Sequence, residues 1–298
     1  MRSPTTLNAT EVRDTPRHWL HRAASAAVVV VLVIVVSSAY LRQASVRLIC
    51  PDWPACTQRV TGEDPARAQP AAERVARLVH RLSASIAGAL VLLIAYLSAV
   101  QQPRVRSDIA LSAAIVVLTV FLAVLGRWSR TTQAPLVTLG NLLGGMTLLA
   151  LLHWTRLRAS RAQSSADGSG RLAPVAGAAL ALTLAGVALG ALVSGSHTVS
   201  AVRAASGELL ASAHMLSGLL VLLLTGALVL HPAARESGRS IGVAAFMLAI
   251  AQAMTGWISM RLDYPLAAAL AHNLLAALML IVLVTAAYRY VRYSRAHR

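Results

Sequence analysis

The feature that most constrains the fold is a series of eight long apolar stretches, separated by short polar segments. They cover roughly residues 19–40, 76–100, 108–127, 136–155, 174–194, 208–230, 241–260 and 266–288. A helix needs about 20 mainly apolar residues to cross the hydrocarbon core of a bilayer. The sequence therefore predicts an all-α integral membrane protein with eight transmembrane helices.

Charge and composition agree with a membrane protein and argue against nucleic-acid binding. Of the 298 residues, 57% are hydrophobic and 13% are charged, and the net charge is +16. All 27 basic residues are arginine, because the chain contains no lysine. The arginines cluster in short segments between the apolar runs instead of following one amphipathic face, which indicates membrane topology.

The first apolar run, AAVVVVLVIVV, follows an arginine-bearing leader and could be a signal peptide or a retained helix. We expect a retained helix, because no small-residue cleavage site follows cleanly. The segments on the side of the termini carry more arginines than the opposite loops, although the first opposite loop is also rich in arginine. This bias predicts that the N- and C-termini lie on the inner, cytoplasmic side of a membrane and that the first loop lies on the outer side.

A polar linker at mid-chain, SRAQSSADGSGRLAP, divides the protein into four helices and four helices. The predicted organisation consists of a cytoplasmic segment (1–18), an N-terminal four-helix bundle (19–155), the cytoplasmic linker (156–173), a C-terminal four-helix bundle (174–288) and a cytoplasmic tail (289–298).

The two halves also resemble each other in sequence. LVHRLSASIAGALVLL begins a helix near residue 76 and SAHMLSGLLVLLLTG begins one near residue 208; APLVTLGNLLGGMTLLALL and YPLAAALAHNLLAALMLIV close the halves, preceded by LGRW and TGW. Duplicated helical units are common in membrane proteins and place sites between the repeats or inside each bundle. We therefore expect two pseudo-symmetric four-helix bundles.

Two histidines in the second half are candidate metal ligands. His214 and His272 lie at similar depth on different helices, each about 9–11 Å along its helix from the outer surface. A polar group within a membrane span is energetically costly. A single histidine there is more often hydrogen-bonded to a neighbouring helix than bound to a metal. A depth-matched pair in one bundle can instead ligate haem iron from both faces, so we interpret this pair as axial haem ligands.

The first half keeps only one of these positions. His80 corresponds to His214, whereas Asn141 stands where His272 would be, and asparagine is a poor ligand for haem iron. A haem in this half would have one protein ligand. His153 lies at the other membrane face, and we expect it to be an interfacial anchor beside Trp154. Arg81 could pair with a haem propionate, or its side chain could extend to the membrane interface.

These residues together resemble the haem A synthase family of cytochrome oxidase assembly proteins. The matching segments are Cys50-Pro-Asp-Trp-Pro-Ala-Cys56, His80-Arg81, APLVTLGNLLGG, His214 and LAHNLLAAL with His272, and the resemblance covers about residues 20 to 290. It implies a pair of four-helix bundles in which His214 and His272 hold haem b. It also implies that haem o is the substrate at His80, where its C8 methyl is oxidised to the formyl group of haem a.

The resemblance further implies that Cys50 and Cys56 form a disulfide in an oxidising compartment. Free or metal-binding thiols are the alternative, although two cysteines alone make a poor zinc site.

The chain departs from the family in its first bundle. The family pattern has a carboxylate three residues before the first histidine, whereas this chain has Arg77 there. Glu73 is seven residues before His80, two turns away, so it could act in catalysis only if this end of the helix were irregular. Asn141 replaces a second expected histidine, and the cysteine pair expected in the second half is missing.

The leading hypothesis is a haem A synthase, an oxidoreductase supplied with haem o by a haem o synthase and working with cytochrome oxidase assembly factors in the lipid membrane. The alternative is a haem b-binding relative that does not hydroxylate and acts in electron transfer or oxidase assembly. A quinol-linked b-type cytochrome normally has two complete histidine pairs, and a transporter is expected to have broken helices. Both classes are therefore less favoured by this sequence. A homo-oligomer is compatible with either hypothesis.

Overall fold

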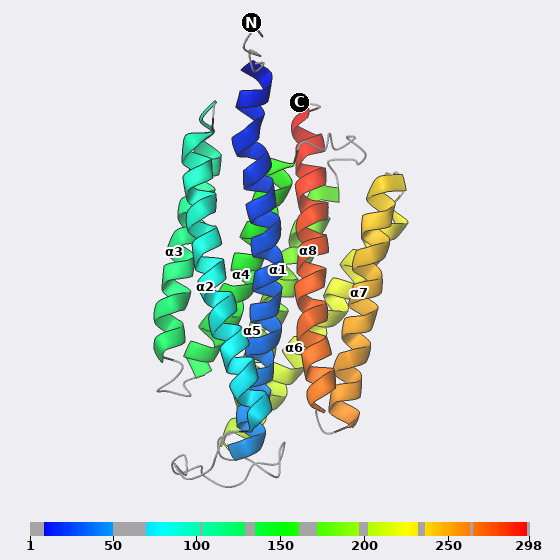
Figure 1. The fold of residues 1–298 in the computed structure, drawn as a ribbon. Coiled ribbons are helices and arrows are strands. Elements are labelled where there is room, and N and C mark those ends of the chain that lie inside the picture. The colour runs from blue at the N-terminus through cyan, green and yellow to red at the C-terminus, as the bar shows by residue number, and fades with distance from the viewer. Residues whose placement is uncertain are drawn as a thin grey trace, which may run out of the picture.

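The computed structural model describes residues 9–49, 70–101, 103–128, 135–160, 172–196, 202–231, 236–262 and 265–296. The helices in these ranges are α1 (Ala9–Ile49), α2 (Ala71–Val100), α3 (Arg106–Trp128), α4 (Pro135–Ala159), α5 (Ala173–Ser196), α6 (Val202–Leu230), α7 (Glu236–Arg261) and α8 (Leu266–Ala296) (Figure 1). The predicted cysteine loop, with Cys50 and Cys56, lies outside the described residues.

All eight described helices contain a segment that is long and apolar enough to cross a membrane. This confirms the predicted all-α, eight-span fold. The two termini lie at the same end of the molecule, which we call the terminal side; the opposite side is the end at which α2 begins (Figure 1). Large aliphatic side chains such as Leu92, Val117 and Leu223 are exposed along the helices, as expected for surfaces that face lipid.

Each group of four consecutive helices packs as a closed ring. In the first ring α1 contacts α2 and α4, and α3 contacts α2 and α4. In the second ring α5 contacts α6 and α8, and α7 contacts α6 and α8. These contacts form the two four-helix bundles, and α1–α4 take the same places in one ring as α5–α8 take in the other.

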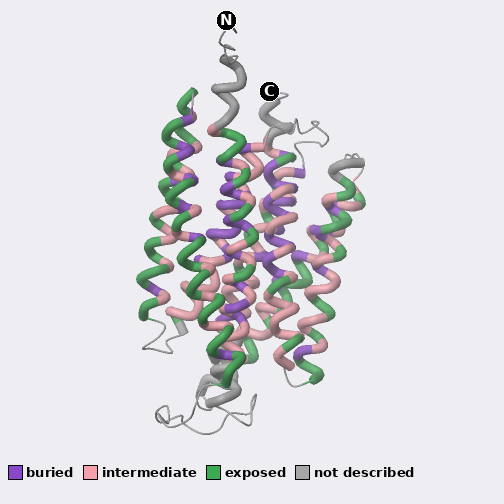
Figure 2. The backbone as a smooth tube through the Cα atoms, viewed as in Figure 1, coloured by how far each residue is buried: buried purple, intermediate pink, exposed green. Residues whose placement is uncertain are grey.

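The interface between the bundles is formed by α1, α4, α5 and α8. The contact of α1 with α8 has its counterpart in the contact of α5 with α4, and α4 also contacts α8. This pattern is what a twofold relation between the bundles requires. In the membrane-spanning segment of α1, 39% of the residues are buried, whereas only 17% are buried in the corresponding segments of α3 and α7. Helix α1 is therefore central, and α3 and α7 are peripheral (Figure 2).

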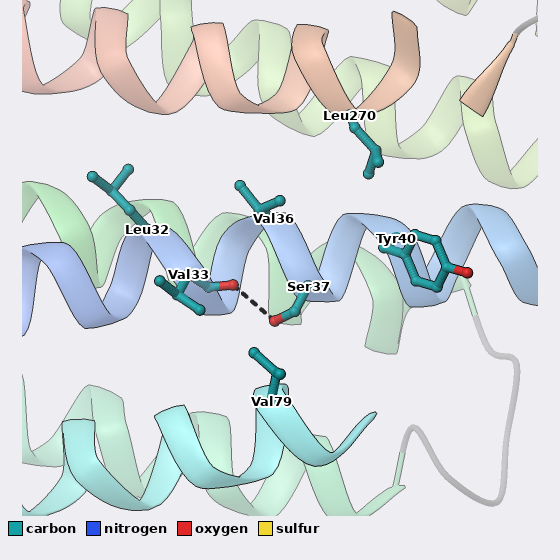
Figure 3. A pocket seen from close by; sticks show the side chains of 7 residues that line it. All are labelled: Leu32, Val33, Val36, Ser37, Tyr40, Val79 and Leu270. Atoms are coloured by element: carbon teal, nitrogen blue, oxygen red, sulfur yellow. Dashed lines mark hydrogen bonds between the residues drawn. The ribbon is translucent and has the colours of Figure 1, made fainter. Parts of the chain in front are cut away.

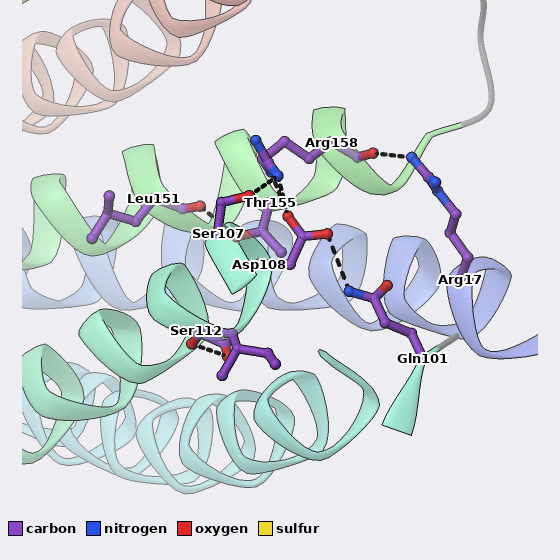
Figure 4. A network of polar contacts seen from close by, with 9 residues as sticks. Arg17, Gln101, Ser107, Asp108, Ser112, Leu151, Thr155 and Arg158 are labelled. Carbon is purple, nitrogen blue, oxygen red and sulfur yellow. Dashed lines mark hydrogen bonds and ion pairs between the residues drawn. The ribbon is translucent and has the colours of Figure 1, made fainter. Parts of the chain in front are cut away.

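A polar cluster joins the helices of the first bundle at the terminal side (Figure 4). Asp108 at the start of α3 forms an ion pair with Arg158 near the end of α4 and accepts a hydrogen bond from Gln101, which follows α2 (3.1 Å). Arg17 of α1 donates to the backbone carbonyl of Arg158 (2.8 Å). The cluster therefore holds the terminal-side ends of α1, α2, α3 and α4 together through hydrogen bonds and an ion pair among its own members.

His153 corrects one expectation from the sequence. Its side chain is only 2% exposed, and its Nε2 atom lies 2.8 Å from Thr285 Oγ1 of α8. The prediction of an interfacial anchor is wrong for this side chain, because it is buried in the contact between the two bundles. Its neighbour Trp154 packs edge-on against Tyr288 of α8, with ring centroids 5.2 Å apart.

Exposed tryptophans mark both ends of the apolar region. Near the terminal side the guanidinium of Arg22 lies over the ring of Trp19 (5.4 Å), and at the opposite side that of Arg261 lies over Trp257 (5.3 Å). Tryptophan and arginine are favoured at the membrane–water boundary, so these pairs fit the two interfaces of a bilayer.

Candidate functional site

His214 of α6 points toward α5 within the second bundle. Its Nδ1 atom lies 2.9 Å from the backbone carbonyl oxygen of Gly186. A carbonyl oxygen can only accept, so Nδ1 carries the proton and Nε2 keeps its lone pair. The hydrogen bond therefore leaves Nε2 as the atom that can bind a metal.

His272 of α8 has the same arrangement with α7. Its Nδ1 atom lies 3.3 Å from Thr255 Oγ1, and this hydroxyl already donates to the backbone carbonyl of Ala251 or Gln252 one turn earlier. The hydroxyl must then accept from Nδ1, which again leaves the lone pair on Nε2. The amide nitrogen of Gln252 lies 3.0 Å from that Nε2 atom and donates a hydrogen bond to it, so Gln252 would have to move before a metal could bind there.

The two histidines face each other across the interior of the bundle. Their ring centroids are 6.2 Å apart, with an angle of 62° between the ring planes. Imidazole nitrogens bind transition metals at about 2 Å, so two imidazoles on opposite sides of one metal ion have centroids about 6 Å apart. The observed separation therefore fits a pair of axial ligands on one iron.

The donor set also fits a porphyrin better than a bare ion. Among the described residues, no group of three or more His, Cys, Asp or Glu side chains is placed to hold a metal. Two imidazoles are sufficient when a porphyrin supplies the equatorial nitrogens, and this is the ligation expected of a b-type haem. His214 and His272 are the residues that would hold it.

Glycines on the neighbouring helices give both rings their space. A Cβ atom on Gly190 of α5 would lie 3.0 Å from Cε1 of His214, and one on Gly256 of α7 would lie 3.3 Å from Cε1 of His272. Both distances are shorter than an ordinary van der Waals contact between carbon atoms. Each ring thus lies directly against the backbone of the preceding helix.

His80 of α2 repeats this arrangement in the first bundle. Its Nδ1 atom lies 3.3 Å from Ser37 Oγ of α1, and the serine hydroxyl donates to the carbonyl of Val33 at 2.8 Å. The hydroxyl therefore accepts from Nδ1, and Nε2 remains available. The predicted ligands His80, His214 and His272 consequently share one tautomer, which is set by the helix that precedes each of them.

The fourth position of this pattern, between α3 and α4, is apolar. When LGRW (125–128) of α3 is aligned with TGW (255–257) of α7, Leu125 corresponds to Thr255 and Leu122 corresponds to Gln252. Their side chains lie against α4: a Cβ atom on Gly140 would be 2.6 Å from Leu125 Cδ2, and one on Gly144 would be 2.7 Å from Leu122 Cδ2. The site around Asn141 therefore lacks the hydroxyl and amide of α7 as well as the imidazole.

Glu73 lies near the start of α2 and is only 3% exposed. It forms an ion pair with Arg77, and its Oε2 atom and the Nε atom of Arg77 are buried without a hydrogen-bond partner. Because α2 is helical from Ala71 onward, Glu73 is two full turns, about 10 Å along the axis, from His80. The irregular helix end that would bring this carboxylate to His80 is not present.

Arg81 follows His80 but its side chain is exposed on the surface of α2. This exposure is compatible with extension to the interface and also leaves the guanidinium accessible to a propionate. The predicted disulfide of Cys50 and Cys56 falls outside the described residues and stays a prediction.

An apolar groove of about 430 Å³ lies beside the His80 site. It is lined by Leu32, Val33, Val36, Ser37 and Tyr40 of α1, Val79 of α2 and Leu270 of α8 (Figure 3). Ser37 belongs both to this groove and to the hydrogen bond with His80. The groove therefore joins the first bundle's histidine to the surface between α1, α2 and α8.

Sequence reasoning missed the residues that orient the histidines: Ser37, Thr255 and Gln252. A usable signal was present for two of them, because Gln252 and Thr255 are polar residues one turn apart in an otherwise apolar span, where such residues are costly. Ser37 gives a weaker signal, since serine hydroxyls in membrane helices commonly bond to the preceding turn.

Two comparisons with known proteins identify the family of this chain. A sequence model of the COX15-CtaA family, described as cytochrome oxidase assembly protein, matches residues 21–284. The chain is also similar to a heme A synthase of Shewanella oneidensis, with 29% identity over 181 residues. That alignment covers 56% of this chain and 54% of the relative, so the chain matches only about half the length of the relative.

Proposed function

Because the chain belongs to the COX15-CtaA family of cytochrome oxidase assembly proteins, we propose that it is a membrane oxidoreductase of the haem A synthase type. Its substrate is haem o, whose C8 methyl group is oxidised to the formyl group of haem a. The observation that carries this proposal is the facing pair His214 and His272, with ring centroids 6.2 Å apart.

The second bundle has the role of an electron-transfer site. Removing electrons from a methyl carbon requires a redox group close to the substrate, and a haem b between His214 and His272 would supply it. The protein's part is to keep both imidazoles in the tautomer whose Nε2 atom is unprotonated, through Gly186 and Thr255. The Gln252 amide, which donates to Nε2 of His272 in this structure, would be displaced by the iron.

The first bundle has the role of the substrate site. His80 would be the axial ligand of haem o, oriented by Ser37 of α1. Lipid-exposed apolar residues around the groove give an apolar substrate a route from the bilayer. Glu73 is the carboxylate of α2, and it forms an ion pair with Arg77 two turns away from His80.

The same bundle supports the second candidate function, a haem b-binding relative that does not oxidise haem o. Asn141 leaves His80 without a facing histidine, and Leu122 and Leu125 replace the polar residues that would orient one. Such a protein would use the second bundle for electron transfer or oxidase assembly.

The placement in the cell follows from the same proposal. The protein would lie in the bacterial inner membrane with cytoplasmic termini, a periplasmic first loop and a Cys50–Cys56 disulfide. Haem o synthase would supply the substrate, and cytochrome oxidase assembly factors would receive the product.

The deciding experiment is expression in a host that makes haem o but has no haem A synthase of its own. The protein is purified in detergent, and its haems are extracted and identified by chromatography and mass. Haem a or its hydroxylated intermediate beside haem b supports the synthase. Haem b alone, lost when His214 or His272 is changed, rejects the synthase and leaves the second candidate.

A further inference from the structure

Asn141 occupies the position in the first bundle that His272 occupies in the second. The two rings have the same order of helix contacts, so α2 lies opposite α4 in the first ring as α6 lies opposite α8 in the second. His214 and His272 face each other across the second ring. By the same arrangement, the Asn141 side chain of α4 lies across the first ring from His80 of α2.

The chemistry of asparagine at this place differs from that of histidine. Nδ1 of His80 is held by Ser37 of α1, so Nε2 is the atom that would bind iron. The Asn141 side chain is shorter than a histidine and ends in an amide, which is a poor ligand for haem iron but has two N–H donors. The amide would therefore stop short of an iron held by His80. It would lie where it can donate to a further ligand of that iron.

The surroundings of Asn141 are apolar and leave room for such a ligand. The side chains of α3 on this side are Leu122 and Leu125, whose methyl groups lie against glycines of α4. Gly145 is one turn from Asn141 on the same face of α4, and a Cβ atom there would meet nothing within 4 Å. Its counterpart on α8 is Ala276, which is 7% exposed and packed in the core. The first bundle thus has open space where the second bundle is filled.

We propose that a haem held by His80 binds a diatomic gas, such as dioxygen or carbon monoxide, on the side of Asn141, and that the Asn141 amide donates a hydrogen bond to the bound gas. The polarity, hydrogen-bond donors and steric access on the open side of a haem decide whether it binds a gas. A small neutral ligand suits an apolar site with one donor, because a charged ligand would lose its hydration there. The inference rests on the proposed function only for the haem at His80.

The second bundle provides the contrast within the same molecule. Its iron would have an imidazole on each side, from His214 and His272, and would keep no position for a gas. The substitution of one histidine position by Asn141 therefore gives the two bundles different tasks. One would hold a closed haem suited to electron transfer, and the other would hold an open haem.

The test uses carbon monoxide, which binds ferrous haem that has an open axial position. The full-length protein, with its resident haem at His214 and His272, is supplied with protohaem, reduced and titrated with the gas in detergent. Absorption measures the affinity, and infrared spectroscopy measures the C–O stretching frequency. The low-spin absorption of the resident haem reports whether each variant is folded. His80→Ala must remove the carbon monoxide signal.

We expect one molecule of carbon monoxide to bind per haem at His80. Asn141→Leu removes the donor, so it should raise the C–O stretching frequency and weaken gas binding by about 2- to 10-fold, the range of one hydrogen bond. Asn141→His supplies a second imidazole and should make this haem low-spin, with gas affinity lower by at least about tenfold. Adding Leu125→Thr, which restores the hydroxyl of the second bundle, should strengthen that effect.

The matched control is Thr147→Val on the same helix as Asn141. The Thr147 hydroxyl donates to the carbonyl of Leu143 on its own helix (2.8 Å), so its loss should leave the gas affinity and the stretching frequency unchanged.

Three results would overturn the proposal: no carbon monoxide binding in the wild type, undiminished binding in His80→Ala, or an unchanged frequency and affinity in folded Asn141→Leu. If Asn141→Leu loses the low-spin signal, Asn141→His decides, and full gas affinity in that variant rejects the site. Haem a formation is a separate measurement. A protein that makes no haem a but shows Asn141-dependent binding rejects the synthase and keeps this site, whereas haem a formation without gas binding does the reverse.

Discussion

His214 and His272 face each other inside the second bundle with ring centroids 6.2 Å apart, and each ring is oriented through Nδ1 by the helix before it. The first prediction concerns that orientation. Thr255→Val removes the acceptor for Nδ1 of His272 and should make the imidazole a weaker donor. We expect haem affinity to fall by about tenfold and the reduction potential of the bound haem to rise.

Haem dissociation and potentiometric titration measure both effects. The matched control is Thr225→Val on α6, because the Thr225 hydroxyl is buried but bonds to the carbonyl of Val221 on its own helix. An unchanged potential in Thr255→Val, or an equal change in the control, would show that Thr255 does not act through His272.

The second prediction uses the close approach of α5 to His214. Gly190→Ala adds a Cβ atom 3.0 Å from the ring, so the imidazole must move away from its place opposite His272. We expect the haem content of the purified protein to fall by at least about half. Gly177→Ala on the same helix adds a Cβ atom with nothing within 4 Å and should keep the haem content. Equal haem content in the two variants would contradict the ligand geometry.

The third prediction concerns the carboxylate of the substrate bundle. The double substitution Glu73→Arg and Arg77→Glu exchanges the members of the ion pair, so it moves the carboxylate to within one turn of His80 and keeps both charges. General acid–base catalysis contributes about 10²–10⁴-fold when the group reaches the reacting atoms. We expect the exchange to increase haem a formation by at least about tenfold.

The amount of haem a per protein, determined after extraction, is the measurement. Arg77→Glu alone would place two carboxylates one turn apart, and it serves as the control for charge. A decrease in haem a in the double variant would indicate that Glu73 acts from its present position.

The fourth prediction concerns the contact between the bundles. His153 and Thr285 join α4 to α8, and polar contacts between membrane helices contribute on average about 0.6 kcal/mol and at most about 1.7 kcal/mol. A double-mutant cycle with His153→Leu and Thr285→Val should give a coupling in this range. Unfolding in detergent or bicelles measures it, and strictly additive effects would argue against the contact.

Much of the fold was predictable because a bilayer permits few solutions. Runs of about 20 apolar residues must be helices, since backbone groups in lipid have to be satisfied within the segment. The repeated motifs around His80, Asn141, His214 and His272 then indicated two bundles and a matched pair of ligands. His153 shows the limit of this reasoning, since its side chain is buried between the bundles and is not an interfacial anchor.

The sequence alone thus determined the number of spans, the division into two halves and the position of each histidine along its helix, because these depend only on position along the chain. Only the tertiary structure decided the partners: Ser37 for His80, Thr255 for His272, Asn273 for Arg42 and Thr285 for His153. The reason is physical. In lipid the outward face of a helix is as apolar as its packed face, so periodicity does not show which side of one helix meets which side of another.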